Sequence, residues 1–368
     1  MDVINDHEMF ETQVMLHLQG NLTDPSCLVS ARAGRARLRS RGREIHHEAF
    51  SQAFPPQMLE TAMHMRDDAL AKLSRFADLP ATLTMQGMIR ERSVPHVARY
   101  RQAFAGFWGS LKIEGHWDSI FGTNPDGEPV FRRGPWEAWP VDLPEFGEVN
   151  PRYPIILSPY CATLFHESVG HALEDDYLQG SPLKFYRGEK VSNTKLTIQD
   201  RPDLPGYAGS MTHDDVGWPL TDTTLIHQGF LVGDLSSKRG AHRRDSYRDA
   251  PLVRATNFMI RGGDENPATW LSSLERCYYV SWIQSGNWRP GGERFKVLTG
   301  PIFEVHRGKV VAKRSWVSLR FSIGGFLGSI AAVGRDMTMD PVVHWCVKKN
   351  QRVPMSMGSP SLLLEDWS

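Results

Sequence analysis

Short apolar segments separated by turn residues make up most of the chain after residue 200, and this pattern restricts that part to a β-rich fold. The segment TLIHQGFLVGDL predicts a hairpin that turns at Gln228–Gly229. The segment IFEVHRGKVVAK predicts a second hairpin that turns at Arg307–Gly308. We therefore expect strands, with one or two inserted helices, to build this half of the protein.

Three segments are candidate helices. Residues 55–79 begin with two prolines, carry an approximate apolar stripe and end in a Leu-Pro pair, and these features predict the clearest helix. Residues 97–108 are a second candidate. A third helix is expected to begin near Pro267. Its apolar face would carry Trp270, Leu271, Leu274, Cys277 and Tyr278.

A segment rich in Gly, Pro and Trp, residues 122–154, predicts a domain boundary near residue 150. The length of 368 residues agrees with two domains of ordinary size. We expect a small N-terminal α/β domain over residues 1–150 and a larger β-rich C-terminal domain over residues 151–368. The fold class is thus α+β, and the C-terminal domain carries the helix that contains His166 and His171.

Charge and composition exclude several functional classes. The 42 basic and 42 acidic side chains cancel, which argues against binding to nucleic acid or a membrane surface through overall charge. No apolar run approaches the roughly 18 residues of a membrane span, and the N-terminus lacks the features of a secretory signal. Four scattered cysteines are too few for a disulfide scaffold. We expect a cytoplasmic protein with reduced thiols, in which Cys161 and Cys277 are small core residues.

Arginines recur at every second position between Arg35 and Arg43. On a strand, this period places them all on one face. Two interpretations are open: a solvated edge strand whose charges discourage aggregation, or a patch for an acidic substrate, partner or nucleic acid.

The sequence HESVGH, residues 166–171, carries the strongest chemical signal. In the zinc-protease pattern H-E-x-x-H, the histidines lie four residues apart on one helix face, and the glutamate serves a metal-bound water. Here His166 and His171 are five residues apart, which separates their side chains by about 140° on an ideal helix. One extra residue accommodated as a π-bulge would restore a common face, and Gly170 lies where the backbone must yield. The motif therefore predicts a distorted helix.

Two histidines and a carboxylate do not define a site by themselves. A helix with incidental histidines is the alternative, but the apolar flanks predict burial, and buried imidazoles need partners. A catalytic zinc takes three protein ligands and one open position. Spacing does not choose the third ligand, and Glu174 could equally accept a hydrogen bond from a ligating imidazole. The candidates are Glu174, Asp175, Asp176, His213, Asp214, Asp215, His344 and Cys346.

Several segments together resemble the TldD/PmbA family, which comprises gyrase modulators and their peptidase relatives. HESVGHALEDD is similar to the family's metal motif, and residues 214–243 are similar to its D-x-x-G-x-P segment and the hairpin that follows. RATNFMIRGGD, residues 254–264, resembles its R-x-T-N segment. The run from Cys346 to Pro360 keeps the spacing of its C-G-K-x-G-Q-x-V-P…G-x-P ending. The resemblance covers roughly residues 155–368.

The resemblance implies a site and a partner. His166, His171 and Cys346 are then the ligands of Zn²⁺, and Glu167 is the catalytic base. A chain that keeps all three ligands corresponds to the metal-bearing, TldD-type subunit. In this family that subunit forms a heterodimer with a PmbA/TldE-like subunit and cleaves extended or unfolded peptides in a closed cavity, including leader peptides of ribosomally made antibiotics.

The sequence also departs from the family pattern. Val347 and Asn350 replace glycines after the ligand cysteine, and Cys277 replaces another glycine. Asn tolerates a positive φ, whereas Val347 implies local repacking. The N-terminal part is shorter than in typical members, which suggests a specialised pathway member.

The expected function is that of a zinc-dependent metallopeptidase, in which zinc lowers the pKa of its bound water and Glu167 accepts the proton. Two alternatives are hydrolysis of an amide or peptide-like bond in a small biosynthetic intermediate and a non-catalytic partner subunit with a structural metal. The glycine-rich segment 322–334 is expected to pack closely against backbone, where an extended substrate could approach. His344 is expected to be a core or rim histidine.

Overall fold

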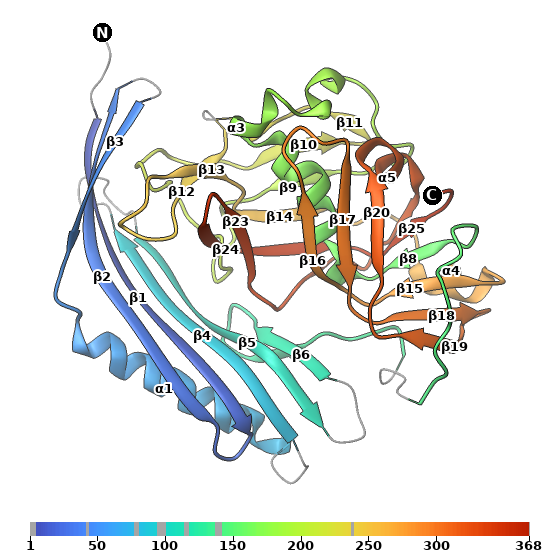
Figure 1. The fold of residues 1–368 in the computed structure, drawn as a ribbon, viewed down its shortest axis with the longest axis horizontal. Helices are drawn as coiled ribbons and strands as arrows, with labels where there is room; N and C mark the ends of the chain where they lie inside the picture. Colours follow the sequence, from blue (N-terminus) through green and yellow to red (C-terminus); the bar gives the residue numbers. More distant parts are fainter. Residues whose placement is uncertain are drawn as a thin grey trace.

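The computed structural model describes residues 5–41, 44–76, 81–93, 101–113, 118–136, 142–236 and 239–367. Figure 1 shows a curved N-terminal sheet beside a larger body of smaller sheets and short helices. The predicted α+β class is confirmed. The division at residue 150 stays a prediction. No helix in the described ranges is long and apolar enough to cross a membrane.

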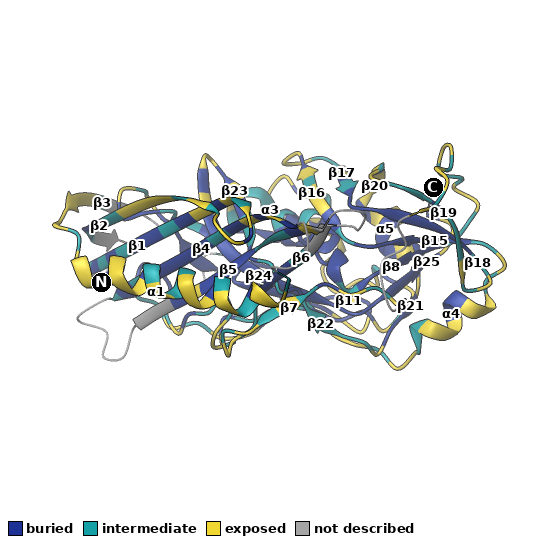
Figure 2. Ribbon diagram, turned by 90° about the horizontal axis from the view of Figure 1, so that it is seen from below, coloured by how far each residue is buried: buried dark blue, intermediate teal, exposed yellow. Residues whose placement is uncertain are grey.

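Seven antiparallel strands form the N-terminal sheet: β1 (Asn5–Asn21), β2 (Ser26–Arg41), β3 (Glu44–Ser51), β4 (Ala81–Ser93), β5 (Arg101–Ile113), β6 (Asp118–Thr123) and β7 (Pro129–Phe131). Their spatial order is β3-β2-β1-β4-β5-β6-β7. Helix α1 (Pro56–Leu73), followed by a 3₁₀ turn (Ser74–Phe76), covers one face of the sheet (Figure 1). The side of α1 away from the sheet is exposed (Figure 2).

Alternation along β1 explains why this sheet has two different faces. Val14, Leu16 and Leu18 are buried in one apolar cluster with residues of α1. Glu11 and Gln13 lie at the intervening positions and bind charged side chains on the opposite face. Because side chains of a strand alternate between faces, the sheet turns its apolar face to α1 and its polar face to the C-terminal body.

A buried ion cluster joins that polar face to the C-terminal body. Arg92 of β4 donates to Glu11 Oε2 over 2.8 Å and to Asp215 Oδ2 over 2.5 Å. Its Nη2 also donates to the carbonyl oxygen of Arg244 over 2.7 Å. Removing one partner of a buried pair leaves an uncompensated charge, which is strongly destabilising. The cluster therefore fixes how the sheet sits on the body.

Two larger sheets form most of the C-terminal body. One has the order β11-β10-β9-β14-β24-β22, with β23 also paired to β24; the other has the order β19-β18-β15-β8-β25-β21. The strands of the first are β9 (Ile198–Asp200), β10 (Thr223–His227), β11 (Phe230–Leu231), β14 (Asn257–Ile260), β22 (Thr338–Met339), β23 (His344–Lys348) and β24 (Gln351–Ser359). Those of the second are β8 (Ile155–Leu157), β15 (Cys277–Val280), β18 (Ile302–His306), β19 (Lys309–Arg314), β21 (Ile330–Val333) and β25 (Leu362–Leu364).

Smaller elements complete the body. A three-stranded sheet contains β16 (Ile283–Trp288), β17 (Arg294–Thr299) and β20 (Ser318–Ser322), and a two-stranded one contains β12 (Ala241–Arg243) and β13 (Leu252–Arg254). The helices are α2 (Thr163–Phe165), α3 (Asp175–Leu178), α4 (Pro267–Ser273) and α5 (Ile323–Ser329), with 3₁₀ turns at Pro159–Cys161, His171–Leu173 and Pro182–Tyr186 and a π-turn at His166–Gly170. The main apolar core of the body surrounds α2 and the π-turn, where Leu164, Phe165 and Val169 are fully buried.

The helix predictions have mixed outcomes. The helix expected within 55–79 is confirmed as α1. The helix expected over 97–108 is wrong: residues 101–108 lie in strand β5, which pairs with β4 and β6 on its two sides, and 97–100 lie outside the described residues. A Cβ at Gly109 of β5 would meet the carbonyl oxygen of Thr84 at 2.1 Å, so this strand depends on close pairing that a helical pattern does not reveal. Helix α4 begins at Pro267 as expected but ends at Ser273, and Cys277 and Tyr278 belong to β15.

Both predicted hairpins are confirmed, as β10–β11 and β18–β19. Gln228 and Gly229 have φ of 48° and 85°, and Arg307 and Gly308 have φ of 46° and 81°. Two successive positive φ values are those of a type I′ turn, whose twist matches the flanking strands.

The arginine-rich strand is only partly as expected. Strand β2 is not an edge strand, because β3 pairs with it over Gly34 to Arg41. Arg35 and Arg37 are about 40% exposed and lie 3.4 and 3.5 Å from Glu8 Oε1, which agrees with a solvated face. The side chains of Arg39 and Arg41, and the whole of Arg43, lie outside the described residues.

We predict that Gly122→Ala lowers the free energy of unfolding by about 1–3 kcal/mol, the usual cost of overpacking. A Cβ at Gly122 of β6 would meet the carbonyl oxygen of Pro341 at 1.8 Å, so the sheet and the segment before β23 must separate. Gly147→Ala is the matched control, because a Cβ there meets nothing within 4 Å. Urea unfolding measures both variants, and equal stability of the two would contradict this contact.

Candidate metal centre

The HESVGH motif forms a single turn of π-helix. The backbone N–H of His171 donates to the carbonyl oxygen of His166, five residues earlier, and a 3₁₀ turn follows directly. The two imidazole ring centroids consequently lie 4.3 Å apart. The distortion predicted from the five-residue spacing is therefore confirmed.

Gly170 makes this close approach feasible. A Cβ at this position would lie 2.9 Å from Cδ2 of His166 and 3.2 Å from Cε2 of Phe258. The His166 ring packs edge-on against Phe258, with 5.7 Å between ring centroids. Any side chain at position 170 would push the imidazole out of this slot.

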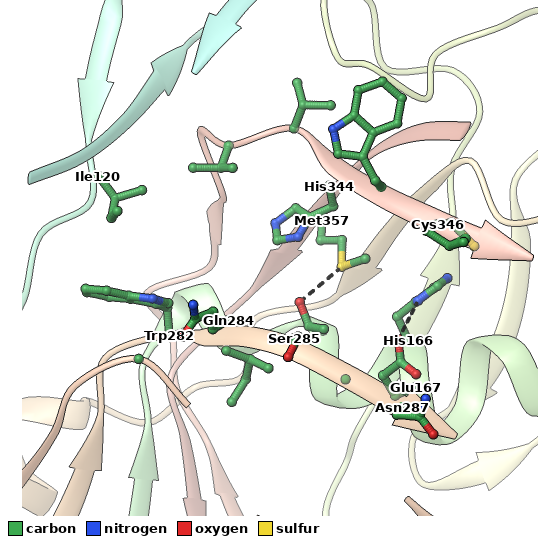
Figure 3. A pocket seen from close by; sticks show the side chains of 18 of the residues that line it. Ile120, His166, Glu167, Trp282, Gln284, Ser285, Asn287, His344, Cys346 and Met357 are labelled. Carbon is green, nitrogen blue, oxygen red and sulfur yellow. Dashed lines mark hydrogen bonds and ion pairs between the residues drawn. The ribbon is translucent and has the colours of Figure 1, made fainter. Parts of the chain in front are cut away.

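Cys346 lies beside the two histidines although it is 175 residues distant from His171 in the sequence. Its Sγ is 3.8 Å from His171 Nε2. One ligand atom from each of His166, His171, Glu174 and Cys346 lies within 4.8 Å of the other three. The structure thus brings together the three residues expected as ligands, and Figure 3 shows Cys346 facing His166 at one end of a pocket.

The other candidate ligands lie elsewhere. Asp214 binds His242 Nδ1 over 2.8 Å, Asp215 belongs to the ion cluster with Arg92, and His213 contacts Thr212. His344 binds Asp340. Asp176 forms ion pairs with Lys348 and Lys349. Among the described residues, neither these nor Asp175 join the cluster of four.

Glu174 orients His171 from behind. Glu174 Oε2 lies 3.1 Å from His171 Nδ1 and accepts from Lys348 Nζ over 2.7 Å. An ionised carboxylate only accepts, so His171 Nδ1 is an N–H nitrogen, and in the neutral ring Nε2 keeps a lone pair on the side of Cys346. A carboxylate behind an imidazole is the usual support for a metal-binding histidine.

Two polar atoms of the cluster are buried without a hydrogen-bond partner in the described part of the chain, His166 Nε2 and Glu174 Oε1. Burying a polar group without a partner costs free energy. Two imidazole nitrogens and a thiolate are typical zinc donors. The donor set and the unsatisfied imidazole nitrogen both fit a divalent ion at this point.

The charges of the cluster favour a thiolate. Burial disfavours ionisation of Cys346, but the positive charges of His171 and Arg254 outweigh it and hold the pKa of the Cys346 thiol well below its usual value. Burial likewise works against protonation of His171, but Cys346 and Glu174 outweigh it and raise the pKa of this imidazole well above its usual value. Cys161 and Cys277, unlike Cys346, have no positive charge that outweighs burial, and burial raises the pKa of each thiol to about 12. Both are fully buried in apolar clusters, as expected from the sequence.

Glu167 lies between the histidines and strand β16. Its Oε1 is 3.8 Å from His166 Nδ1 and 4.0 Å from His171 Nε2. A Cβ at Gly286 of β16 would meet Glu167 Cγ at 2.2 Å, so this glycine makes room for the carboxylate. Burial disfavours the charged form, but His166 and His171 outweigh it and lower the pKa of Glu167. The carboxylate is therefore ionised and able to accept a proton at neutral pH.

A cavity of about 1000 Å³ opens over these groups. One side consists of the polar face of the N-terminal sheet, with Gln86 of β4 and Trp108 of β5, and the other consists of the π-turn, β16 and residues 342–347. Figure 3 shows Glu167, Asn287 and Cys346 around this space. The N-terminal sheet and the C-terminal body thus enclose the candidate site together.

Comparison with known proteins identifies the family. Residues 150–368, more than half of the chain, match the sequence model of the PmbA/TldA metallopeptidase C-terminal domain. The chain belongs to the TldD/PmbA family.

Individual members of the TldD/PmbA family agree with this assignment. A metalloprotease TldD homolog of Buchnera aphidicola is 28% identical over an alignment of 227 residues, and the match covers 58% of this chain and 47% of that protein. A metalloprotease of Synechocystis sp. is 31% identical over an alignment of 232 residues, and the match covers 58% of this chain and 49% of that protein. The chain thus spans about half the length of these relatives.

Solved structures extend the likeness in fold to the N-terminal sheet. TldE from Thermococcus kodakarensis has a TM-score of 0.66 and 16% identity, and covers 98% of this chain and 96% of its own. A Thermotoga maritima protein described as a modulator of a DNA gyrase has a TM-score of 0.68 and 13% identity. The match covers 98% of this chain and 95% of that one. At such identity the likeness concerns the fold alone.

The TldD/PmbA motifs also contain residues whose roles the sequence did not reveal. Arg254 of the R-x-T-N segment donates to the carbonyl oxygen of Cys346 and so fixes β23 beneath the thiol. Lys348, two residues after Cys346, binds Glu174. The alternation of β23 could have indicated that Cys346 and Lys348 share a face. The expectation of close backbone packing in the glycine-rich segment 322–334 holds only at its end. The segment forms α5 and β21, and a Cβ at Gly324 or Gly328 would meet nothing within 4 Å, whereas one at Gly334 would meet the carbonyl oxygen of Ser361 at 2.9 Å.

The depressed pKa of Cys346 predicts its reactivity in chelator-treated protein. An ordinary thiol loses roughly 70-fold in thiolate between pH 8 and pH 6, whereas a thiol whose pKa lies well below its usual value stays ionised as the pH falls toward that lower pKa. We expect the rate at which iodoacetamide alkylates Cys346 to fall far less than 70-fold between pH 8 and pH 6, as measured by peptide mass spectrometry. Cys161, with its raised pKa, is the internal control and should not react. A decline of roughly 70-fold at Cys346 would contradict the electrostatic account.

Proposed function

We propose that this chain is a zinc-dependent metallopeptidase of TldD type that hydrolyses extended or unfolded peptides. The observation that carries the proposal is the convergence of two imidazoles, one cysteine sulfur and the separate carboxylate of Glu167 at the end of one cavity. The relatives that match the C-terminal body are named metalloproteases, which supports metal-dependent hydrolysis of peptides by this chain.

His166, His171 and Cys346 would hold the ion in this proposal. Three protein ligands leave a fourth position open, as in catalytic zinc sites, whereas structural sites are closed by four protein ligands. Glu174, the fourth member of the cluster, is engaged by His171 and Lys348 and supports His171 in place of binding the metal. A bound zinc ion would lower the pKa of a coordinated water and polarise the scissile carbonyl.

Glu167 would act as the general base. Its carboxylate lines the cavity, and its Oε1 lies 3.8 Å from His166 Nδ1 and 4.0 Å from His171 Nε2. The carboxylate is therefore available to the attacking water. Glu167 would take the proton of that water and transfer it to the leaving nitrogen.

Strand β16 offers a place for an extended substrate. Residues 283–288 all line the cavity, and β16 pairs with β17 on one side, whereas no described strand pairs with its other side. An extended peptide can add to such an edge through backbone hydrogen bonds, largely independent of its side chains. This geometry favours a peptide over a small amide, and β16 replaces the glycine-rich segment as the expected point of approach.

A PmbA/TldE-like subunit is the proposed partner in a heterodimer. The support is that this chain has all three residues expected as metal ligands and that its sequence relatives include TldD homologs. Co-expression with a PmbA-like protein and co-purification through a tag on one chain would test the pairing.

We predict that the purified protein contains about one zinc per chain and cleaves β-casein, an unfolded protein, at sites that mass spectrometry can map. Glu167→Gln should lower kcat by about 10²- to 10⁴-fold, the usual contribution of a general base, and leave zinc content by plasma mass spectrometry unchanged. Glu275→Gln is the matched control, because that side chain is 88% exposed. Full activity of Glu167→Gln would refute the assigned base, and cleavage of small acylated amino acids without any cleavage of casein would refute the peptide substrate.

A further inference from the structure

A second buried polar unit lines the same cavity and takes no part in the metal cluster. Arg132, in the segment after β7, donates to both carboxylate oxygens of Asp340, from Nε over 2.9 Å and from Nη2 over 2.6 Å. His344 Nε2 lies 2.9 Å from Asp340 Oδ2. Asp340 is 1% exposed at its side chain, whereas His344 and Arg132 reach the cavity.

The hydrogen bonds of Asp340 define the orientation of His344. Oδ1 accepts from Arg132 Nε and from the backbone N–H of Val342, and Oδ2 accepts from Arg132 Nη2. A carboxylate with three such donors is ionised and can only accept, so His344 Nε2 must be the N–H nitrogen. In the neutral ring, Nδ1 then carries a lone pair and is an acceptor.

Arg132 is itself held in place, which makes the unit rigid. Its guanidinium lies 5.7 Å from the ring centroid of Tyr160 and 5.5 Å from that of Trp282. The fixed fork of an arginine permits two parallel hydrogen bonds to one carboxylate. The His344 ring, and with it the acceptor Nδ1, is therefore held in one orientation in the cavity wall.

His344 lies next to the metal cluster. It is two residues before Cys346 on β23, and residues two apart on a strand share a face about 7 Å apart. Figure 3 shows both side chains on the same side of this strand. The side chain of His344 is 14% exposed, and no described residue binds its Nδ1. An extended peptide advances by a similar distance over two residues.

We propose that His344 is a substrate-binding residue, whose Nδ1 accepts a hydrogen bond from one backbone N–H of an extended peptide within about two residues of the scissile bond. This inference rests on the proposed function, because it requires a peptide in the cavity. It assigns Asp340 and Arg132 as positioning residues that set the tautomer and orientation of the ring.

The test uses full-length, zinc-loaded protein and a labelled synthetic peptide that spans a mapped casein cleavage site. The Glu167→Gln background prevents turnover, so that fluorescence anisotropy reports peptide binding alone. In a series of peptides, one backbone N–H at a time, other than that of the scissile bond, is replaced by an ester oxygen. This exchange removes a single donor and changes the shape of the peptide little.

We expect one ester position to weaken binding roughly 2- to 12-fold, the usual value of one neutral hydrogen bond. In Glu167→Gln/His344→Phe, binding of the unmodified peptide should be weaker by a similar factor, and the ester at that position should cause no further loss. Esters at other positions should keep their effects. His227→Phe, at an exposed position outside the cavity, is the matched control.

The possible failures are distinguishable. If every ester has the same effect with and without His344, the inference about His344 is overturned while the proposed function stands. If neither background binds the peptide and protein with Glu167 intact does not cleave it, both fall. Zinc content and unfolding temperature are measured for each variant, and His344→Leu replaces His344→Phe if the larger ring is not tolerated.

Discussion

The single turn of π-helix at His166–Gly170 is the constraint on which the rest of the site depends. An α-helical turn would direct His166 and His171 about 140° apart, and only the additional residue in the turn places their ring centroids 4.3 Å apart. Gly170 permits this arrangement because it has no Cβ. His166 and Phe258 occupy the space that a side chain at this position would need. The surrounding apolar core then holds the distorted turn in place.

The remaining parts of the site come from distant segments that the fold fixes around this turn. Arg254 holds the carbonyl of Cys346, and Lys348 holds the carboxylate of Glu174, so that β23 and the π-turn are tied together on both sides of the thiol. The N-terminal sheet supplies the opposite wall of the cavity and is anchored by the buried cluster of Arg92, Glu11 and Asp215. The candidate metal ligands thus come from the C-terminal body, whereas the N-terminal sheet forms one wall of the cavity.

Local features were predictable from the sequence, whereas long-range ones were predictable only where a family motif carried them. The five-residue spacing indicated the π-turn, and the turn dipeptides indicated both hairpins. Cys346 could not be chosen from spacing, since 175 residues separate it from His171; the resemblance of the C-terminal motif supplied it. The segment 97–108 was misjudged because strand β5 depends on pairing with β4 and β6. The acceptor role of His344 depends on Arg132, more than 200 residues away from Asp340, and no local pattern reveals it.

X-ray absorption at the zinc edge of the purified, full-length protein shows whether the π-turn and Cys346 bind the same ion. We expect one sulfur at about 2.3 Å and two imidazole nitrogens at about 2.0–2.1 Å, with one further light atom from an exchangeable ligand. Absence of the sulfur shell, or its persistence in Cys346→Ser, would contradict the convergence of the π-turn and β23 on one ion.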